Sequence, residues 1–176
     1  MTPETHLTDY IRSRRDFPRR GTVFRDITPL LLNPAGFREA VRQMADYFRD
    51  ASIDAVAAAE PRGFIFAAPL ALELNAGFLP VRRPTRVQFS TQAFDYAVAD
   101  FHEDVLSAYK DNINPSQRIL FVDDLLATGA SVESCCRLIE HAGGVVAGCV
   151  FLIELKEFRG AERLHKYNTH SLIEYS

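Results

Sequence analysis

Two kinds of apolar pattern follow one another along the chain: short, mainly apolar runs and longer stretches with helical spacing. Apolar runs of this length are typical of strands buried within a parallel sheet. They occur at residues 53–59, 78–81, 119–122 and 145–152, and Asp54 is the one charged residue within them. Because stretches with helical spacing lie between the runs, the chain is predicted to have an α/β fold, with a mostly parallel central sheet flanked by helices.

The ends of the predicted helices are marked by specific residues. Asn33 supplies a capping side chain and Pro34 suits the first helical position, so a helix is expected to begin there. A second helix is predicted at residues 64–75, ended by Gly77, and a third at residues 132–142.

The composition is that of an ordinary soluble domain and excludes several protein classes. The 176 residues are 47% hydrophobic and 24% charged, so we expect one globular domain spanning residues 1–176. No apolar run approaches the ~20 residues that a membrane span needs, and the polar N-terminus lacks a signal-peptide core. Three cysteines without a CxxC motif indicate reduced thiols and a cytoplasmic location. The net charge of −3 argues against a nucleic-acid partner, although six arginines between residues 12 and 25 leave a basic patch as an alternative.

The stretch ILFVDDLLATGAS, residues 119–131, carries the strongest chemical signal. Its apolar residues predict a strand, with Asp123 and Asp124 at the carboxyl end. The following loop contains Thr128, Gly129 and Ser131 and leads into a predicted helix. Ligands of open α/β sheets bind outside the carboxyl ends of strands, and the free amides at a helix start hold anions.

This arrangement predicts a ribose 5-phosphate group as the ligand. The loop offers amides and hydroxyls to a phosphate, and the two carboxylates accept hydrogen bonds from ribose hydroxyls or bind Mg²⁺. The motifs GxxxxGK[ST] and GxGxxG are both missing, which argues against a P-loop and against a dinucleotide site. An ordinary strand-to-helix turn with capping Asp and Ser residues is the alternative, but it accounts poorly for the whole string.

Four segments resemble one family, the type I purine phosphoribosyltransferases. VDDLLATGAS, residues 122–131, resembles the motif of that family for 5-phosphoribosyl-1-pyrophosphate (PRPP), and its DDLLATG form is closest to the adenine-specific members. DFPRRGTVFRDITPLL, residues 16–31, is similar to their N-terminal segment. EPRGF, residues 60–64, resembles their ESRGF loop, and residues 151–155 resemble the last core strand.

The resemblance implies a role for individual residues. Asp123 and Asp124 are assigned to the ribose hydroxyls, and the loop Ala127, Thr128, Gly129, Ala130 and Ser131 to the 5-phosphate. Arg62 is assigned to the pyrophosphate, as a catalytic residue, and Glu60 and Arg83 to substrate binding. Val23, Phe24 and Arg25 are assigned to the purine, with residues 1–32 as a purine-side segment.

Elementary chemistry is consistent with the purine and pyrophosphate assignments. The ring of Phe24 can stack on a purine, and the main chain beside it offers the donor and acceptor that N1 and N6 of adenine require. Core packing for Phe24 and a plain surface position for Arg62 are the alternatives. A cis bond before proline costs only about 0.5–1 kcal/mol, and we predict that Glu60-Pro61 is cis.

The implied activity is purine salvage: adenine and PRPP give AMP and pyrophosphate. Mg²⁺ is expected on the pyrophosphate, with Asp123 and Asp124 reaching it only through water, and a homodimer is expected. In the expected mechanism the bond from C1 to pyrophosphate loosens and N9 of the purine attacks. A flexible loop at about residues 82–101 is expected to close and exclude water.

One departure from the family pattern concerns proton transfer. The family loop ends in YxLEYG, and its glutamate assists proton transfer at N7 of the purine. Here YAVADF, residues 96–101, has Ala99 at that position, so we expect the neighbouring Asp100 to take the role. This departure leaves two alternatives open: a sibling enzyme for hypoxanthine, guanine or xanthine, and a PRPP- or nucleotide-sensing module that has lost catalysis.

Overall fold

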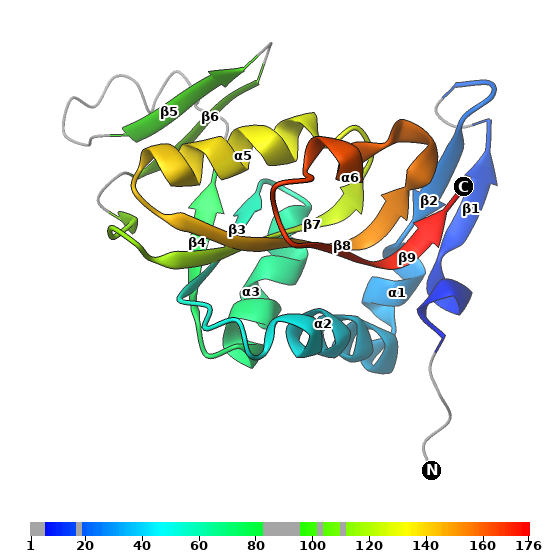
Figure 1. Ribbon diagram of the computed structural model, residues 1–176. Helices are drawn as coiled ribbons and strands as arrows, with labels where there is room; N and C mark the ends of the chain where they lie inside the picture. Colours follow the sequence, from blue (N-terminus) through cyan, green and yellow to red (C-terminus); the bar gives the residue numbers. More distant parts are fainter. Residues whose placement is uncertain (1–5, 17–18, 83–95, 102–103, 110–111) are drawn as a thin grey trace.

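Five parallel strands form the central sheet of the protein, in the order β4-β3-β7-β8-β9 (Figure 1). The computed structural model describes residues 6–16, 19–82, 96–101, 104–109 and 112–176. The strands are β3 (Ala55–Ala59), β4 (Gly77–Val81), β7 (Arg118–Leu126), β8 (Val145–Leu155) and β9 (Thr169–Tyr175). All neighbouring pairs run parallel, which confirms the predicted α/β fold.

Helices cover both faces of this sheet (Figure 1). The helices are α1 (Thr28–Leu32), α2 (Pro34–Phe48), α3 (Gly63–Glu73), α5 (Ala130–His141) and α6 (Gly160–Arg163). On one face α2 and α3 bury Met44 and Phe66 in an apolar cluster with Leu120 of β7. On the other face α5 buries Ile139 against Phe121. Successive side chains of a strand point to opposite faces, so neighbouring residues of β7 belong to different halves of the core.

Two antiparallel hairpins lie outside the central sheet. The first joins β1 (Arg12–Arg15) to β2 (Val23–Asp26), and the second joins β5 (Tyr96–Phe101) to β6 (Asp104–Tyr109). Two short 3₁₀ helices, Leu7–Tyr10 and Lys156–Phe158, complete the described elements. Within these described ranges, no helix is both long and apolar enough to cross a membrane.

The predicted helix ends agree with the structure at one helix and need correction at another. Asn33 caps α2 as expected, because its Oδ1 accepts a hydrogen bond from the Gly36 amide at 2.8 Å. The helix predicted at residues 64–75 ends earlier, at Glu73. Asn75, with φ of 53°, takes the left-handed position that was expected of Gly77, and Gly77 instead begins β4.

The strand predicted at residues 119–122 is longer than expected. β7 continues to Leu126, and its pairing with β8 includes Asp123 and reaches Leu126. Asp123 and Asp124 therefore lie within the strand and not in the loop after it. The regular strand backbone holds both carboxylates in place, and the loop begins only at Ala127.

Candidate active site

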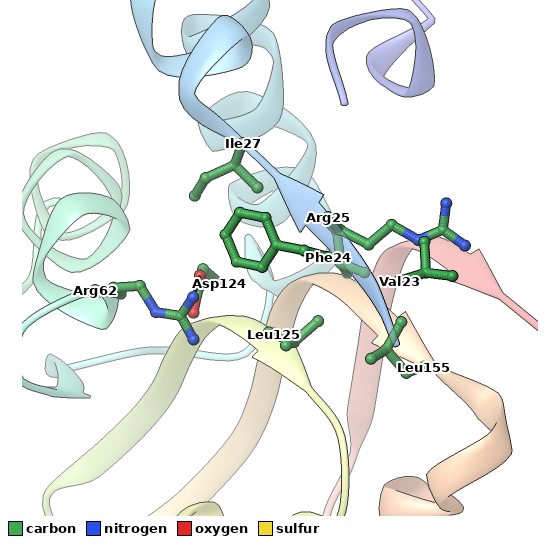
Figure 2. Close-up of a pocket in the computed structure, with 9 residues that line it drawn as sticks. Val23, Phe24, Arg25, Ile27, Arg62, Asp124, Leu125 and Leu155 are labelled. Atoms are coloured by element: carbon green, nitrogen blue, oxygen red, sulfur yellow. Dashed lines mark ion pairs between the residues drawn. The ribbon is translucent and has the colours of Figure 1, made fainter. Parts of the chain in front are cut away.

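A pocket with about 350 Å³ of empty space opens where β7 and β8 end and β2 crosses them (Figure 2). Most of its lining side chains are apolar, and Arg62 and Asp124 supply the charged groups at one end. The lining residues are Val23, Phe24, Arg25, Ile27, Arg62, Asp124, Leu125, Ile153 and Leu155. A concave apolar site with a few polar groups is the usual form of a small-molecule site.

Strand β2 presents an unpaired main-chain edge to this pocket. The Asp16 amide donates to the Thr22 carbonyl at 2.7 Å, which makes these residues a hydrogen-bonded pair of the hairpin. Bonded pairs alternate along an antiparallel ladder, so the Phe24 position is bonded to β1 and its two neighbours are not. Val23 and Arg25 therefore direct their N–H and C=O groups away from β1. Within the described residues, no other strand pairs with that edge.

The side chains of Phe24 and Arg25 point in opposite directions, as expected for neighbours on a strand. Figure 2 shows the Phe24 ring directed toward Arg62 and Asp124, and the Arg25 guanidinium directed away from them. The guanidinium carbon of Arg25 lies 3.7 Å from the centre of the Tyr175 ring, and its Nη1 donates to the Ser13 hydroxyl. Arg25 therefore offers only its main chain to a ligand in the pocket.

Asp123 and Asp124 differ in their surroundings. The buried Asp124 faces Arg62, with 3.3 Å between Oδ2 and Nη1. Asp123 accepts a hydrogen bond from the Asp124 amide at 2.9 Å and lies beside Gly63, at the start of α3. Burial and the charge of Asp124 raise the pKa of Asp123 to about 7. Burial also raises the pKa of Asp124, and the nearby Arg62 opposes this rise.

The loop between β7 and α5 is shaped by two glycines that lie far apart in the sequence. Gly129 has φ of 73°, and a Cβ there would lie 3.0 Å from the carbonyl oxygen of Gly160. A Cβ on Gly160 would collide with the carbonyl of Ala127. The close approach of α6 therefore determines the course of the loop. The first amides of α5, from Ala130 onward, begin directly after it, as an anion site requires.

The loop before α3 contacts the outer strand β4 at one residue and the pocket at another. The amide of Glu60 donates to the Val81 carbonyl of β4 at 3.1 Å. The Glu60-Pro61 bond is cis, which confirms the prediction from the sequence. Arg62 follows directly, with about half of its side chain exposed, and extends into the pocket.

The structure brings five of the predicted site residues together in the pocket. Val23, Phe24, Arg25, Arg62 and Asp124 line one pocket. The loop at residues 127–131 follows Asp124 in the chain, and Asp123 lies beside the pocket under the start of α3.

Three predicted residues are not placed in this way: Glu60, Arg83 and Asp100. Glu60 does not line the described pocket, and its amide bonds to β4. Arg83 lies outside the described residues, as does most of the loop expected at residues 82–101. Asp100 lies on β5 opposite Val105, but the described part of the structure does not include its side chain. Its catalytic role therefore stays a prediction.

Four lining residues were not predicted as site residues: Ile27, Leu125, Ile153 and Leu155. Leu125 lies inside the DDLLATG string, and Ile153 and Leu155 lie in the segment that resembles the family's last core strand. These residues lie within recognised motifs, but the sequence does not distinguish an apolar side chain that lines a pocket from one that packs in the core.

Comparisons with known proteins all indicate the same family. The family described as phosphoribosyl transferase domain matches residues 27–174. The adenine phosphoribosyltransferase of Rhodopirellula baltica is 48% identical over 169 residues, which cover 96% of this chain and 82% of that protein. The adenine phosphoribosyltransferase of Clostridium perfringens is 44% identical over 169 residues, covering 96% and 98% of the two chains.

A solved structure agrees with these relatives. The crystal structure of adenine phosphoribosyltransferase from Thermoanaerobacter pseudethanolicus superimposes with a TM-score of 0.88 at 37% identity. The match covers 96% of this chain and 98% of that one. The pocket, the β7–α5 loop and the sheet thus belong to a fold shared over almost the whole length.

Proposed function

Because the chain belongs to the phosphoribosyl transferase domain family, we propose that the pocket beneath β2 is the active site of a purine salvage enzyme. The enzyme transfers the phosphoribosyl group of PRPP to adenine and yields AMP and pyrophosphate. The same reaction defines it as a pentosyl transferase.

The observation that carries the choice of base is the unpaired edge of β2. Adenine needs a donor for N1 and an acceptor for its N6 amino group, and a free strand edge supplies N–H and C=O groups side by side. Val23 and Arg25 provide these groups, and the ring of Phe24 lies beside them as a stacking surface. Within the described pocket there is no lysine to donate to the oxygen of a 6-oxo purine, which would depend on the same main-chain N–H groups.

The rest of the site is assigned to PRPP. The loop at residues 127–131 would hold the 5-phosphate on its amides, and the carboxylates of Asp123 and Asp124 would accept hydrogen bonds from the ribose. Arg62, free to turn from Asp124, would neutralise the pyrophosphate as it leaves. The bond from C1 to pyrophosphate breaks while N9 of adenine bonds to C1. Asp100 is the candidate for proton transfer at the purine.

The carboxylates fit a Mg²⁺ ion that is held mainly by the substrate. Hard oxygen donors suit Mg²⁺, which usually keeps several waters and substrate phosphates as ligands. Among the described residues, no group of three His, Cys, Asp or Glu side chains is close enough to hold a metal alone. We assign Asp123 and Asp124 a contact with the ion through water. When bound, Mg²⁺ supplies charge neutralisation on the pyrophosphate.

A homodimer is supported by the exposed face of α3. A helix that is apolar on all sides is typical of a buried element, yet Ile65 and Leu72 of α3 are 37% and 83% exposed. Phe78 of β4 is 39% exposed beside them, and its ring packs edge-on against Phe64 at 5.2 Å. We assign this face, formed by Phe64, Ile65, Leu72 and Phe78, to a second copy of the chain.

A cytoplasmic location is part of the same proposal. Its support is chemical: Cys135, Cys136 and Cys149 are buried cysteines that form no disulfide, and reduced thiols are typical of proteins of the cytoplasm.

The test is AMP formation from labelled adenine, PRPP and Mg²⁺, with hypoxanthine, guanine and xanthine as competing bases. We expect AMP and pyrophosphate in equal amounts, with adenine preferred over the other bases. Turnover of another base in place of adenine would contradict the assignment of the β2 edge. PRPP binding without turnover of any base would contradict the enzymatic proposal itself and favour a sensing module.

A further inference from the structure

One side chain connects the unpaired edge of β2, which we assign to the purine, with strand β9. Arg25, whose main chain faces the pocket, extends its guanidinium away from the pocket (Figure 2). Its guanidinium lies over the ring of Tyr175. Tyr175 is the last residue of β9, an outer strand of the central sheet. The hairpin of β1 and β2 belongs to a separate sheet, so this stack connects two sheets that share no main-chain pairing.

The environment of Arg25 makes the ring its principal partner. Nε of Arg25 is buried and has no hydrogen-bond partner among the described residues. No carboxylate of the described residues forms an ion pair with Arg25. The Ser13 hydroxyl accepts a hydrogen bond from Nη1 and not from Nε. A buried guanidinium nitrogen without a hydrogen-bond partner is costly unless another group compensates, and the face of an aromatic ring does so through the cation–π attraction.

Tyr175 is also aligned with the floor of the pocket. In the parallel register of β8 and β9, Tyr175 lies directly opposite Leu155, which lines the pocket. Register partners place their side chains on the same face of a sheet, so the ring and Leu155 are neighbours. A displacement of the ring would therefore move the guanidinium of Arg25 relative to the pocket floor, and with it the main chain of β2.

We propose that Tyr175 is a positioning residue for the base: its ring holds Arg25, and thereby fixes the Val23–Arg25 edge at the distance from Leu155 that a purine requires. This inference rests on the proposed function, because it assigns the base to the edge of β2. Tyr175 touches no reacting atom. Its effect is specific to one substrate, since Asp124 and the β7–α5 loop, which would hold PRPP, do not depend on the position of the hairpin.

The test compares KM for adenine with KM for PRPP in variants that keep or remove the ring face. Tyr175→Leu keeps an apolar side chain but removes the ring, and KM for adenine is expected to rise about 3- to 30-fold. KM for PRPP is expected to stay within about twofold. Tyr175→Phe retains the ring and should restore KM for adenine to near the wild-type value.

Arg25→Met gives the reciprocal change, because it removes the guanidinium and keeps an unbranched apolar stem. It should raise KM for adenine by a similar factor. The double variant Arg25→Met/Tyr175→Leu should be no worse than either single variant, since both remove the same interaction.

A second aromatic stack on β9 provides a matched control. Tyr47 of α2 stacks on His170, near the opposite end of β9, with ring centres 3.9 Å apart. Tyr47→Leu also removes an aromatic stack, but it lies away from β2 and should leave both KM values unchanged. Thermal unfolding of every variant shows whether a loss of global stability accompanies the kinetic change.

The proposal is overturned if Tyr175→Leu leaves KM for adenine within twofold of wild type, or if it raises both KM values alike. If Tyr175→Leu does not fold, Arg25→Met decides alone, and an unchanged KM for adenine overturns the proposal. Failure of the proposed function is seen separately, because the wild-type enzyme would then form no AMP from adenine.

Discussion

Nη1 of Arg62 lies 3.3 Å from Oδ2 of Asp124, so the loop before α3 and the end of β7 are joined across one end of the pocket. The two partners are unequal: half of the Arg62 side chain is exposed, whereas Asp124 is buried. The buried carboxylate is therefore fixed by the strand, and the arginine is the mobile partner. A pyrophosphate group arriving at this end would compete with Asp124 for the guanidinium.

Asp124→Asn removes the charge that a ribose hydroxyl and Arg62 both use. Hydrogen bonds to charged groups contribute about 1.5–3 kcal/mol, so kcat/KM for PRPP is expected to fall about 10- to 100-fold. The measurement is initial rate against PRPP concentration at saturating adenine. Asp50→Asn, at an exposed position after α2, is the control and should leave the rate unchanged. Unaltered kinetics for Asp124→Asn would show that this carboxylate does not hold the ribose.

The raised pKa of Asp123 predicts a pH dependence of stability. Its carboxyl group has a pKa of about 7 in the fold against 3.8 for the free group, because of burial and the charge of Asp124. Between these values the folded protein binds more protons than the unfolded chain, so this group makes the protein less stable as the pH rises from about 4 to 7. Relative to wild type, Asp123→Asn should gain on the order of 4 kcal/mol between pH 4 and pH 8.

Urea unfolding of both proteins at several pH values measures this difference. Subtracting the two curves cancels the titrating groups away from the site, including Asp26 and Glu39, whose hydrogen bonds lower their pKa values. The difference then reports the titration of the Asp123 and Asp124 pair, because each carboxyl group influences the other. A difference that is constant from pH 4 to pH 8 would contradict the raised pKa of Asp123.

Gly129→Ala tests whether the approach of α6 shapes the phosphate loop. Gly129 has φ of 73°, and a Cβ would lie 3.0 Å from the Gly160 carbonyl. Gly21 has a similar φ of 86°, but no atom lies within 4 Å of a Cβ there. Both alanine variants pay about 1–2 kcal/mol for a left-handed residue, seen in thermal unfolding. Only Gly129→Ala should also raise KM for PRPP, by about tenfold if the contact is worth a further ~1.4 kcal/mol. Equal KM values for PRPP in the two variants would show that the β7–α5 loop does not contribute to PRPP binding.

Phe24→Leu keeps an apolar side chain but loses the ring that faces the pocket. Aromatic pairs contribute about 0.5–1.5 kcal/mol beyond the area they bury, so KM for adenine should rise about 2- to 10-fold while KM for PRPP is unchanged. Phe158→Leu, at a residue 47% exposed outside the pocket lining, is the matched control. A similar effect of both substitutions would argue against stacking by Phe24.

Leu72→Lys tests the face of α3 assigned to a second copy of the chain. At 83% exposure this residue contributes little to the fold of one chain, but a lysine in a subunit interface would be buried without a partner. We expect a dimer for wild type and a monomer for Leu72→Lys in sedimentation analysis. Leu32→Lys, at an equally exposed leucine of α1, should remain dimeric. A monomeric wild-type protein would exclude the proposed interface.

Local patterns were sufficient for the elements that build the centre of the sheet. The central parts of β3, β7 and β8 are runs of consecutive apolar residues, because both faces of an inner parallel strand are buried. The hairpin of β1 and β2 was not predicted, since every residue of β1 is exposed and leaves no alternation to read. The predicted site was strongest where the chain itself brings groups together, as at Asp123, Asp124 and the loop to Gly129.

The amino-acid sequence by itself determined the strand-and-helix order, the phosphate loop and the family, because these depend on neighbours within a few residues. Only the tertiary structure decided which distant residues share the pocket: Ile153 and Leu155 from β8, and Gly160 against Ala127. It also decided the pKa of Asp123, which depends on burial, and the stack of Arg25 on Tyr175. The physical reason is the same in each case. Strand order and the packing of one layer on another join residues that no local spacing relates.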